Sequence, residues 1–236
     1  GYPLFLAVVG SDQAVVIAQM ILGIIITFVL FYIGYKISHQ PVFAGMSALV
    51  HTLNLNQLFF ESSLITETLA TFWVILSLLG AFIWLNNKTK RTVWMGLAIG
   101  LAATLAAFTR PLFIFLPFWL TFFLALFSDG LKIRINWRPL VSTFTLSAVL
   151  IGAWINYIHE NYYMWSFSSL TGFNMVQHTG YYFEYVPDKF ATLRDTYIRF
   201  RDERIAKYGT QGNAIWAAIP EMQRQRVQRG RSRQQA

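Results

Sequence analysis

Two charged residues, Glu67 and Arg110, lie at the ends of long apolar runs, where charge is rare. Glu67 is the single charged residue between Ser62 and Leu85, and Arg110 lies within the segment AAFTRPLF. A guanidinium can bind a phosphate through two parallel hydrogen bonds and can stabilise negative charge on a leaving group. A carboxylate at a membrane boundary can meet a lipid headgroup or a metal ion. The two residue types therefore favour recognition of a phosphate at a membrane surface.

Each of these residues also has a structural interpretation. Glu67 in the first turn of a helix complements the helix dipole by about 0.3 to 1 kcal/mol, with Thr66 or Ser63 as the cap. Arg110 can extend its side chain toward lipid headgroups from the end of a helix. Pro111 disfavours a helical conformation at the residue before it, so a helix should end or turn at Arg110.

Other polar residues give weaker signals. Glu61 lies about 240° from Glu67 around a continuous helix, so the two share a site only if the backbone breaks near Ser62. His51 and Asn54 lie inside an apolar run, where we expect hydrogen bonds within a helix bundle rather than a ligand role. The remaining histidines are too far apart for metal-ligand spacing: His39, His159 and His178.

Several classes of chemistry lack their sequence signatures. The chain contains no cysteine, which excludes disulfides and thiolate catalysis. It also contains no Walker loop, GxGxxG, GxSxG or HExxH motif, so soluble nucleotide chemistry is unsupported.

The composition indicates a membrane protein. Of the 236 residues, 55% are hydrophobic and 13% are charged, far from the balance of a soluble domain. A spanning helix needs about 20 mainly apolar residues. We predict an all-α, multispanning transmembrane helix bundle of about six helices. Their approximate ranges are Ala14 to Tyr35, Val42 to Leu58, Ser63 to Leu85, Thr92 to Thr109, Leu112 to Phe127 and Leu140 to His159.

The basic residues of the short loops predict the orientation of these helices. The segments 1–13 and 53–62 contain no Lys or Arg, so the positive-inside rule places them outside the cytoplasm, together with Glu67 and Arg110. The net charge of +8 then reflects topology rather than binding of nucleic acid. The basic loop residues of the other side are Lys36, Lys88, Lys90, Arg91, Lys132, Arg134 and Arg138.

We divide the chain into a transmembrane domain, 1–159, and an extracytoplasmic segment, 160–236. The second part is rich in aromatic residues, which either line an acceptor groove or partition to the membrane surface. The stretch Lys189 to Tyr208 predicts an amphipathic helix, and a short helix should run from Asn213 to Pro220. The apolar face of the first helix would hold Phe190, Leu193, Tyr197, Ile198 and Ile205. The basic end, QRQRVQRGRSRQQA, has the composition of a disordered tail.

The order of several segments resembles the GT-C glycosyltransferases, in particular the bacterial relatives of protein O-mannosyltransferases and lipid A aminoarabinose transferases. The segments are GYPLFLAVVG, AQMILGIIITFVLFYIGYKI, SSLITETLATFWVILSLL and MGLAIGLAATLAAFTRPLFIFLPFWL. The resemblance covers 1–127, and HTGYYFEYVPDKFATLRD is also similar to bacterial members.

The resemblance implies an enzyme of the bacterial inner membrane. It would move a sugar from a polyprenyl-phosphate carrier to a lipid, glycan or protein acceptor on the extracytoplasmic face. Glu67 matches the second acidic position of the family, which organises a divalent metal or the donor phosphate, and Arg110 matches a phosphate-binding position. The family's catalytic Asp precedes the YPLF segment, so we expect it upstream of Gly1, and this chain alone would be inactive; Asp12 follows the motif and does not match.

Two other functions remain open. A transporter or flippase for a lipid-linked substrate often places ionisable groups or broken helices at the middle of the bilayer, where His51 is the one deep titratable group. A non-catalytic membrane subunit could instead bind its partner through the Lys189 to Tyr208 helix.

Overall fold

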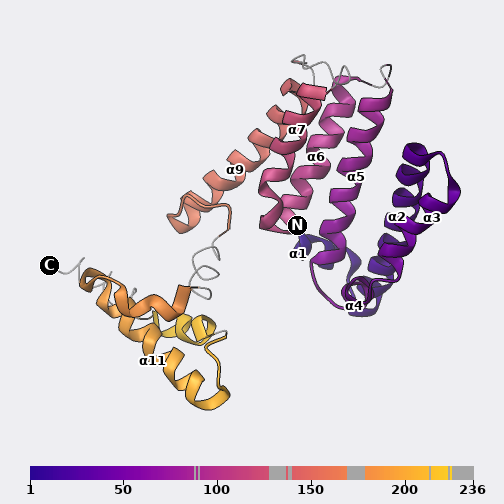
Figure 1. Ribbon diagram of the computed structural model, residues 1–236. Helices are drawn as coiled ribbons and strands as arrows, with labels where there is room; N and C mark the ends of the chain where they lie inside the picture. The colour runs from indigo at the N-terminus through magenta and orange to yellow at the C-terminus, as the bar shows by residue number, and fades with distance from the viewer. Residues whose placement is uncertain are drawn as a thin grey trace. The chain divides into compact units, whose positions relative to one another are not determined.

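The computed structural model describes residues 1–87, 89, 91–127, 137, 140–168, 179–212, 214–222 and 224. Throughout this part the chain forms helices and no strand, which confirms the predicted all-α fold. The chain divides into two compact units, Gly1–Tyr157 and Ile158–Ala236 (Figure 1). The predicted inner-loop residues Lys88, Lys90, Lys132, Arg134 and Arg138, together with His178 and the basic end except Arg224, lie outside the described residues.

The first unit is a bundle of apolar helices whose ends follow local sequence signals. Ser11 Oγ accepts a hydrogen bond from the Ala14 backbone amide at the start of one helix, as N-caps do. Thr92 Oγ1 does the same for the amide of Met95. In chain order the elements are α1 (Tyr2–Val9), α2 (Asp12–Ser38), α3 (Pro41–Thr52), α4 (Leu55–Ser62), α5 (Glu67–Asn86), α6 (Val93–Thr109), η2 (Pro111–Phe115), α7 (Leu116–Phe127), η3 (Leu140–Phe144) and α9 (Thr145–Tyr162).

Three helical segments are long and apolar enough to cross a membrane: Asp12–Ser38, Glu67–Asn86 and Val141–Tyr162. Two further apolar segments, Val93–Thr109 and Pro111–Phe127, are shorter. The 17 residues of α6 extend about 26 Å, slightly less than the hydrocarbon thickness of about 30 Å. Small differences of this kind are accommodated by local thinning of the bilayer.

The second predicted span, Val42 to Leu58, is wrong as a single helix. The 12-residue α3 ends at Thr52, and Asn54 begins α4 by accepting a hydrogen bond from the Asn56 amide. Asn favours helix starts because its side chain competes for backbone donors. The two short helices still run antiparallel to α2 and pack along it. Gly34, near the end of α2, contacts α3, and Gly23, nearer its start, contacts α4.

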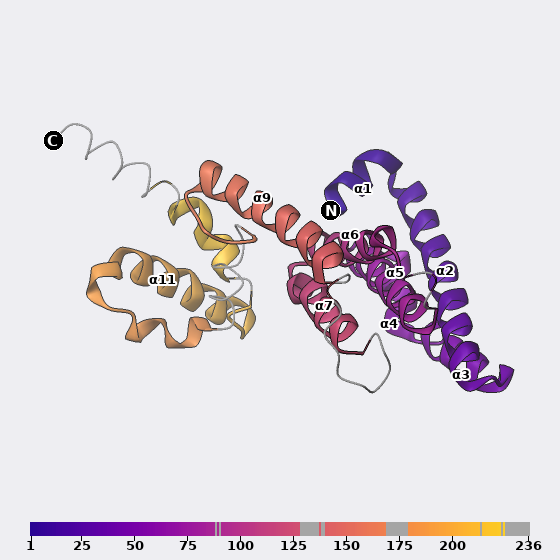
Figure 2. The same cartoon turned by 90° about the horizontal axis from the view of Figure 1, so that it is seen from above.

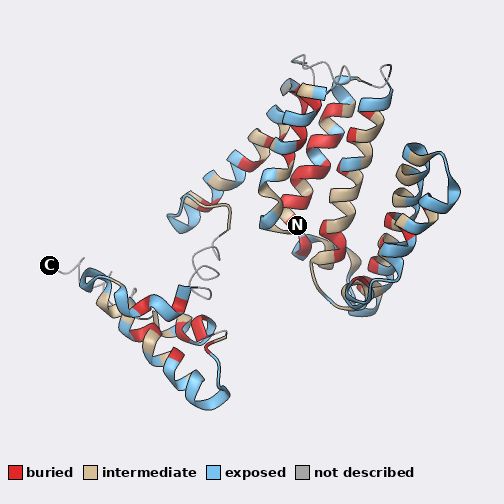
Figure 3. Ribbon diagram, viewed as in Figure 1, coloured by how far each residue is buried: buried red, intermediate tan, exposed pale blue. Residues whose placement is uncertain are grey.

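Helix α6 lies at the centre of the unit, beside α5 and α7, with α2 and α3 beyond α5 (Figure 2). Figure 3 shows the buried positions concentrated on it. A Cβ added at Gly100 would lie 2.8 Å from the Thr143 carbonyl oxygen, so only glycine permits this approach. Small residues at such interfaces let membrane helices pack closely. The core beside α6 comprises Ala81, Trp84, Ile99, Ala103, Leu120 and Leu124.

The second unit packs short 3-10 helices, η4 (Gly180–Tyr185) and η5 (Asp188–Phe190), with α11 (Ala191–Tyr208) and a helical stretch at 214–222. Tyr197 packs on Phe183 with ring centroids 4.4 Å apart. The predicted apolar face of α11 is partly wrong, because Phe190 and Leu193 are exposed while Arg201 is buried. The reason is that Arg201 finds polar partners inside: it donates to the Gly180 carbonyl and to Glu184 Oε1.

The Arg201 to Glu184 contact predicts a response of the second unit to acid. Its hydrogen bond, 2.6 Å long, is the main reason that the pKa of Glu184 is lowered. A carboxyl group with a lowered pKa contributes stability above its unfolded pKa, about 4.3, and this is lost as pH falls through the folded value. We expect hydrogen–deuterium exchange of α11 peptides, corrected for intrinsic rates, to accelerate below about pH 4.3.

Glu184→Gln should remove most of this acid-dependent step. Glu203→Gln changes an exposed carboxylate of α11 and serves as the control, which should behave as the wild type. An unchanged acid response in Glu184→Gln would show that other groups cause it.

Candidate functional site

Glu67 and Arg110 form an ion pair, with Arg110 Nη1 3.1 Å from Glu67 Oε1. The helices explain this meeting, because α5 begins at Glu67 and the neighbouring α6 runs back and ends at Thr109. Arg110 itself is extended, with φ −144° and ψ 113°, and Pro111 starts η2 directly after it. The predicted turn at Arg110 is therefore present, and the structure brings both predicted residues to one place.

Both side chains of the pair remain accessible. The Arg110 side chain is 42% exposed and that of Glu67 is 20% exposed. Thr66 donates its hydroxyl to Glu67 Oε2 at 3.2 Å. Thr66 occupies the N-cap position of α5, but its side chain makes no hydrogen bond to the backbone there. Its hydroxyl binds the Glu67 carboxylate instead. The guanidinium has further N–H donors that can meet a second anion.

A buried glutamine, Gln19 of α2, binds the backbone that leads to Glu67. Its Nε2 donates to the backbone carbonyls of Phe60, Glu61 and Ser63, at 3.4, 3.2 and 2.6 Å. These carbonyls belong to the end of α4 and the connection into α5. Gln19 is fully buried, and unpaired carbonyls there would be costly. The amide therefore fixes the backbone four residues before Glu67.

Tyr2 joins the N-terminal segment to the same place. Its hydroxyl donates to Gln19 Oε1 at 3.1 Å. Burial and, second, the charge of Glu67 raise the pKa of Tyr2, so the phenol stays protonated. Gly1 lies against the backbone of Phe108, with no room for a Cβ. The segments GYPLF and AAFTRPLF thus meet at the ion pair.

Tyr2 and Gln19 were missed by the sequence interpretation. Gln19 is an amide within a long apolar run, and such residues in a spanning helix usually have a polar partner. That signal could have singled it out. Nothing in the sequence indicated that its partners are backbone carbonyls, because carbonyls occur at every residue.

In the part of the chain that the structure describes, Glu61 makes no contact with the Glu67 to Arg110 ion pair. The chain does break after Ser62, as a shared site requires, but the carboxylate takes another direction. It accepts a hydrogen bond from Gln57 Nε2 at 3.1 Å and lies against Gly23. The contact with α2 is possible because Gly23 has no side chain.

His51 lies with Thr27 and Thr52 between α2 and α3. Its Nδ1 is 3.2 Å from Thr27 Oγ1, which is also 3.2 Å from Thr52 Oγ1. The prediction that His51 is hydrogen-bonded inside the bundle is confirmed. Asn54, the other polar residue of this run, acts as the N-cap of α4.

The residues at the ion pair do not make up a site for a divalent metal. Of the carboxylates in the described part of the chain, Glu67 alone pairs with Arg110, and both of its oxygens have partners. No group of three His, Asp or Glu residues able to hold a metal occurs among the described residues. A guanidinium 3.1 Å away also repels a cation.

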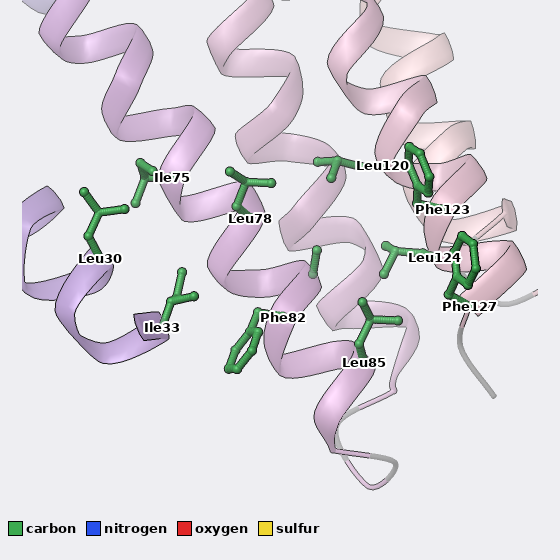
Figure 4. Close-up of a pocket in the computed structure, with 11 residues that line it drawn as sticks. Leu30, Ile33, Ile75, Leu78, Phe82, Leu85, Leu120, Phe123, Leu124 and Phe127 are labelled. Carbon is green, nitrogen blue, oxygen red and sulfur yellow. The ribbon is translucent and has the colours of Figure 1, made fainter. Parts of the chain in front are cut away.

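A wholly apolar pocket of about 540 Å³ lies between α2, α5 and α7 (Figure 4). Its lining side chains come from all three helices and carry no polar atom. The lining residues are Leu30, Ile33, Ile75, Leu78, Ala81, Phe82, Leu85, Leu120, Phe123, Leu124 and Phe127. In a bilayer such a pocket suits a hydrocarbon chain.

The pocket follows the same helix faces as the polar site. At about 100° per residue, Leu78 and Leu85 lie within about 20° of Glu67 around α5. Leu30 likewise lies about 20° from Gln19 around α2. Ile75, the lining residue of α5 nearest to Glu67 in sequence, is about 12 Å along the helix axis. The pocket and the ion pair therefore share part of one face of α5, although Ile75 itself lies about 80° from Glu67 around the helix.

Comparison of the chain with protein-family models, curated proteins and solved structures finds no match.

The Gln19 contacts generate a stability prediction. Gln19→Leu removes the partner of Tyr2 and of three carbonyls, so we expect a loss of about 2 to 4 kcal/mol of unfolding free energy. Thermal unfolding of the detergent-solubilised protein measures this loss. Gln13→Leu, at an exposed position of the same helix, is the matched control and should change little. Equal unfolding temperatures for both variants would contradict the supporting role of Gln19.

Proposed function

We propose that the protein is an integral membrane glycosyltransferase, which moves a sugar from a polyprenyl-phosphate carrier to a lipid, glycan or protein acceptor. The observation that carries the proposal is the Glu67 to Arg110 ion pair at one end of the bundle. The order of the segments that resemble GT-C enzymes supports the reaction type. The protein then belongs to a bacterial plasma membrane, with its site facing outward.

The chain's own residues act on the phosphate. Transfer breaks the bond between the anomeric carbon and a phosphate oxygen, and that carbon bonds to an acceptor oxygen. The acceptor's proton passes to a carboxylate base, which in the GT-C family is an aspartate before the YPLF segment. The electron pair of the broken bond stays on the phosphate. Arg110 donates hydrogen bonds to this phosphate and stabilises its growing charge, while Glu67 holds the guanidinium in place.

The apolar pocket supports a lipid carrier over a soluble donor. It lies on the faces of α2 and α5 that also carry Gln19 and Glu67. With the phosphate at Arg110, the hydrocarbon chain can run along α5 past Ile75 toward Leu85. Moving a hydrocarbon chain from water into an apolar pocket gains about 25 cal/mol per Å² of buried surface. A lipid chain is already in an apolar environment inside the bilayer, so the pocket would orient the chain more than it would raise the affinity.

The described loop charges support an outward-facing site. Lys36 lies in the last turn of α2, and Arg91 follows α5, where it donates to the carbonyls of Trp84 and Leu85. Both lie at the opposite helix ends from Gln19 and Glu67. By the positive-inside rule the Lys36 end is cytoplasmic and the ion pair is outside.

Cysteine labelling tests this orientation, because the 236 residues include no cysteine that would react in the background. Ser62→Cys lies at the same end of the helix bundle as the ion pair, and Thr89→Cys lies at the opposite end. Both positions are exposed. A membrane-impermeant maleimide should label Ser62→Cys on intact cells and Thr89→Cys only after permeabilisation. The reverse pattern would place the ion pair in the cytoplasm and end the proposal.

Sugar transfer from a labelled polyprenyl-phosphate donor tests the roles of the pair. In the full-length protein, Arg110→Ala should lower the transfer rate about 10²- to 10³-fold, the usual effect of losing one charge-stabilising donor. Glu67→Gln should lower it less, because the guanidinium remains. Asp12→Asn alters another exposed first-turn acid, and it should retain wild-type transfer. Normal transfer in both Arg110→Ala and Glu67→Gln, with intact membrane insertion, would defeat the assignment.

Transport of a lipid-linked substrate is a second candidate, because one observation favours it. The interruption between α3 and α4 lies next to the His51, Thr27 and Thr52 cluster, and broken helices with polar groups line transporter sites. The test is movement of a fluorescent lipid-linked substrate across the membrane of proteoliposomes. Movement that is lost in His51→Asn but kept in Arg110→Ala would support transport. Sugar transfer dependent on Arg110 would support the enzyme.

A further inference from the structure

The charges at the ion pair balance. Arg110 contributes one positive charge and Glu67 one negative charge at 3.1 Å, and Tyr2 is neutral. The neighbouring ionisable group from α4, Glu61, is bonded to Gln57 instead. Each negative charge on a bound phosphate is therefore attracted by Arg110 and repelled by Glu67. The repulsion offsets part of the attraction, because the carboxylate lies close behind the guanidinium that contacts the phosphate.

We propose that Glu67 sets the charge preference of this phosphate site: it reduces the advantage that a doubly charged phosphate would have over a singly charged one. The proposal rests on the proposed function and adds a role in product release. The donor is a phosphodiester with one negative charge. After transfer the carrier is a phosphomonoester, because the electron pair of the broken bond stays on its oxygen, and it carries up to two charges.

This preference has a mechanistic consequence. An arginine alone would hold the doubly charged product more tightly than the singly charged donor, so product would block the site. The adjacent carboxylate weakens the hold on each charge by a similar amount, so the doubly charged product loses about twice as much binding free energy as the singly charged donor. Glu67 thus acts as a specificity-determining residue, in addition to holding the guanidinium.

Lipid binding to the full-length protein in detergent tests the proposal by native mass spectrometry. The probes are dioleoyl phosphatidylglycerol, a phosphodiester, and dioleoyl phosphatidic acid, a phosphomonoester, at pH 8. If Glu67→Gln tightens phosphatidylglycerol binding about fivefold, it should tighten phosphatidic acid binding about twenty-five-fold, because the free energy doubles with the charge. The ratio of the two affinities then rises about fivefold over the wild type.

A pH series separates this effect from a structural one. The second pKa of a phosphomonoester is about 6, so at pH 5 phosphatidic acid carries one charge. In Glu67→Gln the preference for phosphatidic acid should therefore disappear between pH 8 and pH 5. Asp12→Asn is the control and should keep the wild-type affinity ratio, and Arg110→Gln gives the background of binding elsewhere.

The outcomes are distinct. Equal changes for the two lipids in Glu67→Gln, or weaker binding of both, would overturn the charge preference. This result would leave the transferase proposal standing, since sugar transfer is measured separately. Conversely, the transfer assay could fail to show the proposed dependence on Arg110 and Glu67 while Glu67→Gln still shifts the ratio of lipid affinities. The site would then select between phosphate lipids as proposed, but the protein would not be the proposed transferase.

Discussion

The position of the candidate site depends on the buried amide of Gln19. It holds the carbonyls at the end of α4 and before α5, and it receives the hydroxyl of Tyr2. A glutamine inside an apolar helix is costly unless all of its donors and acceptors are used. Since both the N-terminal segment and the start of α5 supply partners, this one side chain fixes the two elements that adjoin Glu67.

The second requirement is a close approach of α6 to its neighbours. Its small residues, among them Gly96 and Gly100, contact η3 and let α6 sit at the centre of the bundle. Membrane helices gain little from apolar burial against each other, so such close packing supplies much of their association. With α6 placed antiparallel to α5, its C-terminal end delivers Arg110 to the beginning of α5. A displacement of α6 by one turn, about 5.4 Å, would separate the pair.

The ion pair changes the interpretation of both residues. A lone arginine at a helix end extends into lipid headgroups, and a lone first-turn glutamate complements the helix dipole. Paired at 3.1 Å, they form an orienting contact that still leaves the guanidinium 42% exposed. An exposed pair contributes little to stability, about 0 to 1 kcal/mol. The pair therefore orients the guanidinium more than it stabilises the fold.

The sequence by itself determined that the chain is an all-α membrane protein, where five of the six apolar helices run, and that Glu67 and Arg110 stand at helix ends. Hydrophobicity, proline and charge are local properties, so they can be read without a fold. Only the tertiary structure decided that α3 and α4 are separate helices, that Glu61 turns to Gln57 and Gly23, and that Arg201 is buried. It also decided that Gln19 binds carbonyls and that Glu67 touches Arg110. Apart from the local bonds of Asn54 to Asn56 and of Gln57 to Glu61, these contacts join residues distant along the chain, and their geometry depends on how the helices pack.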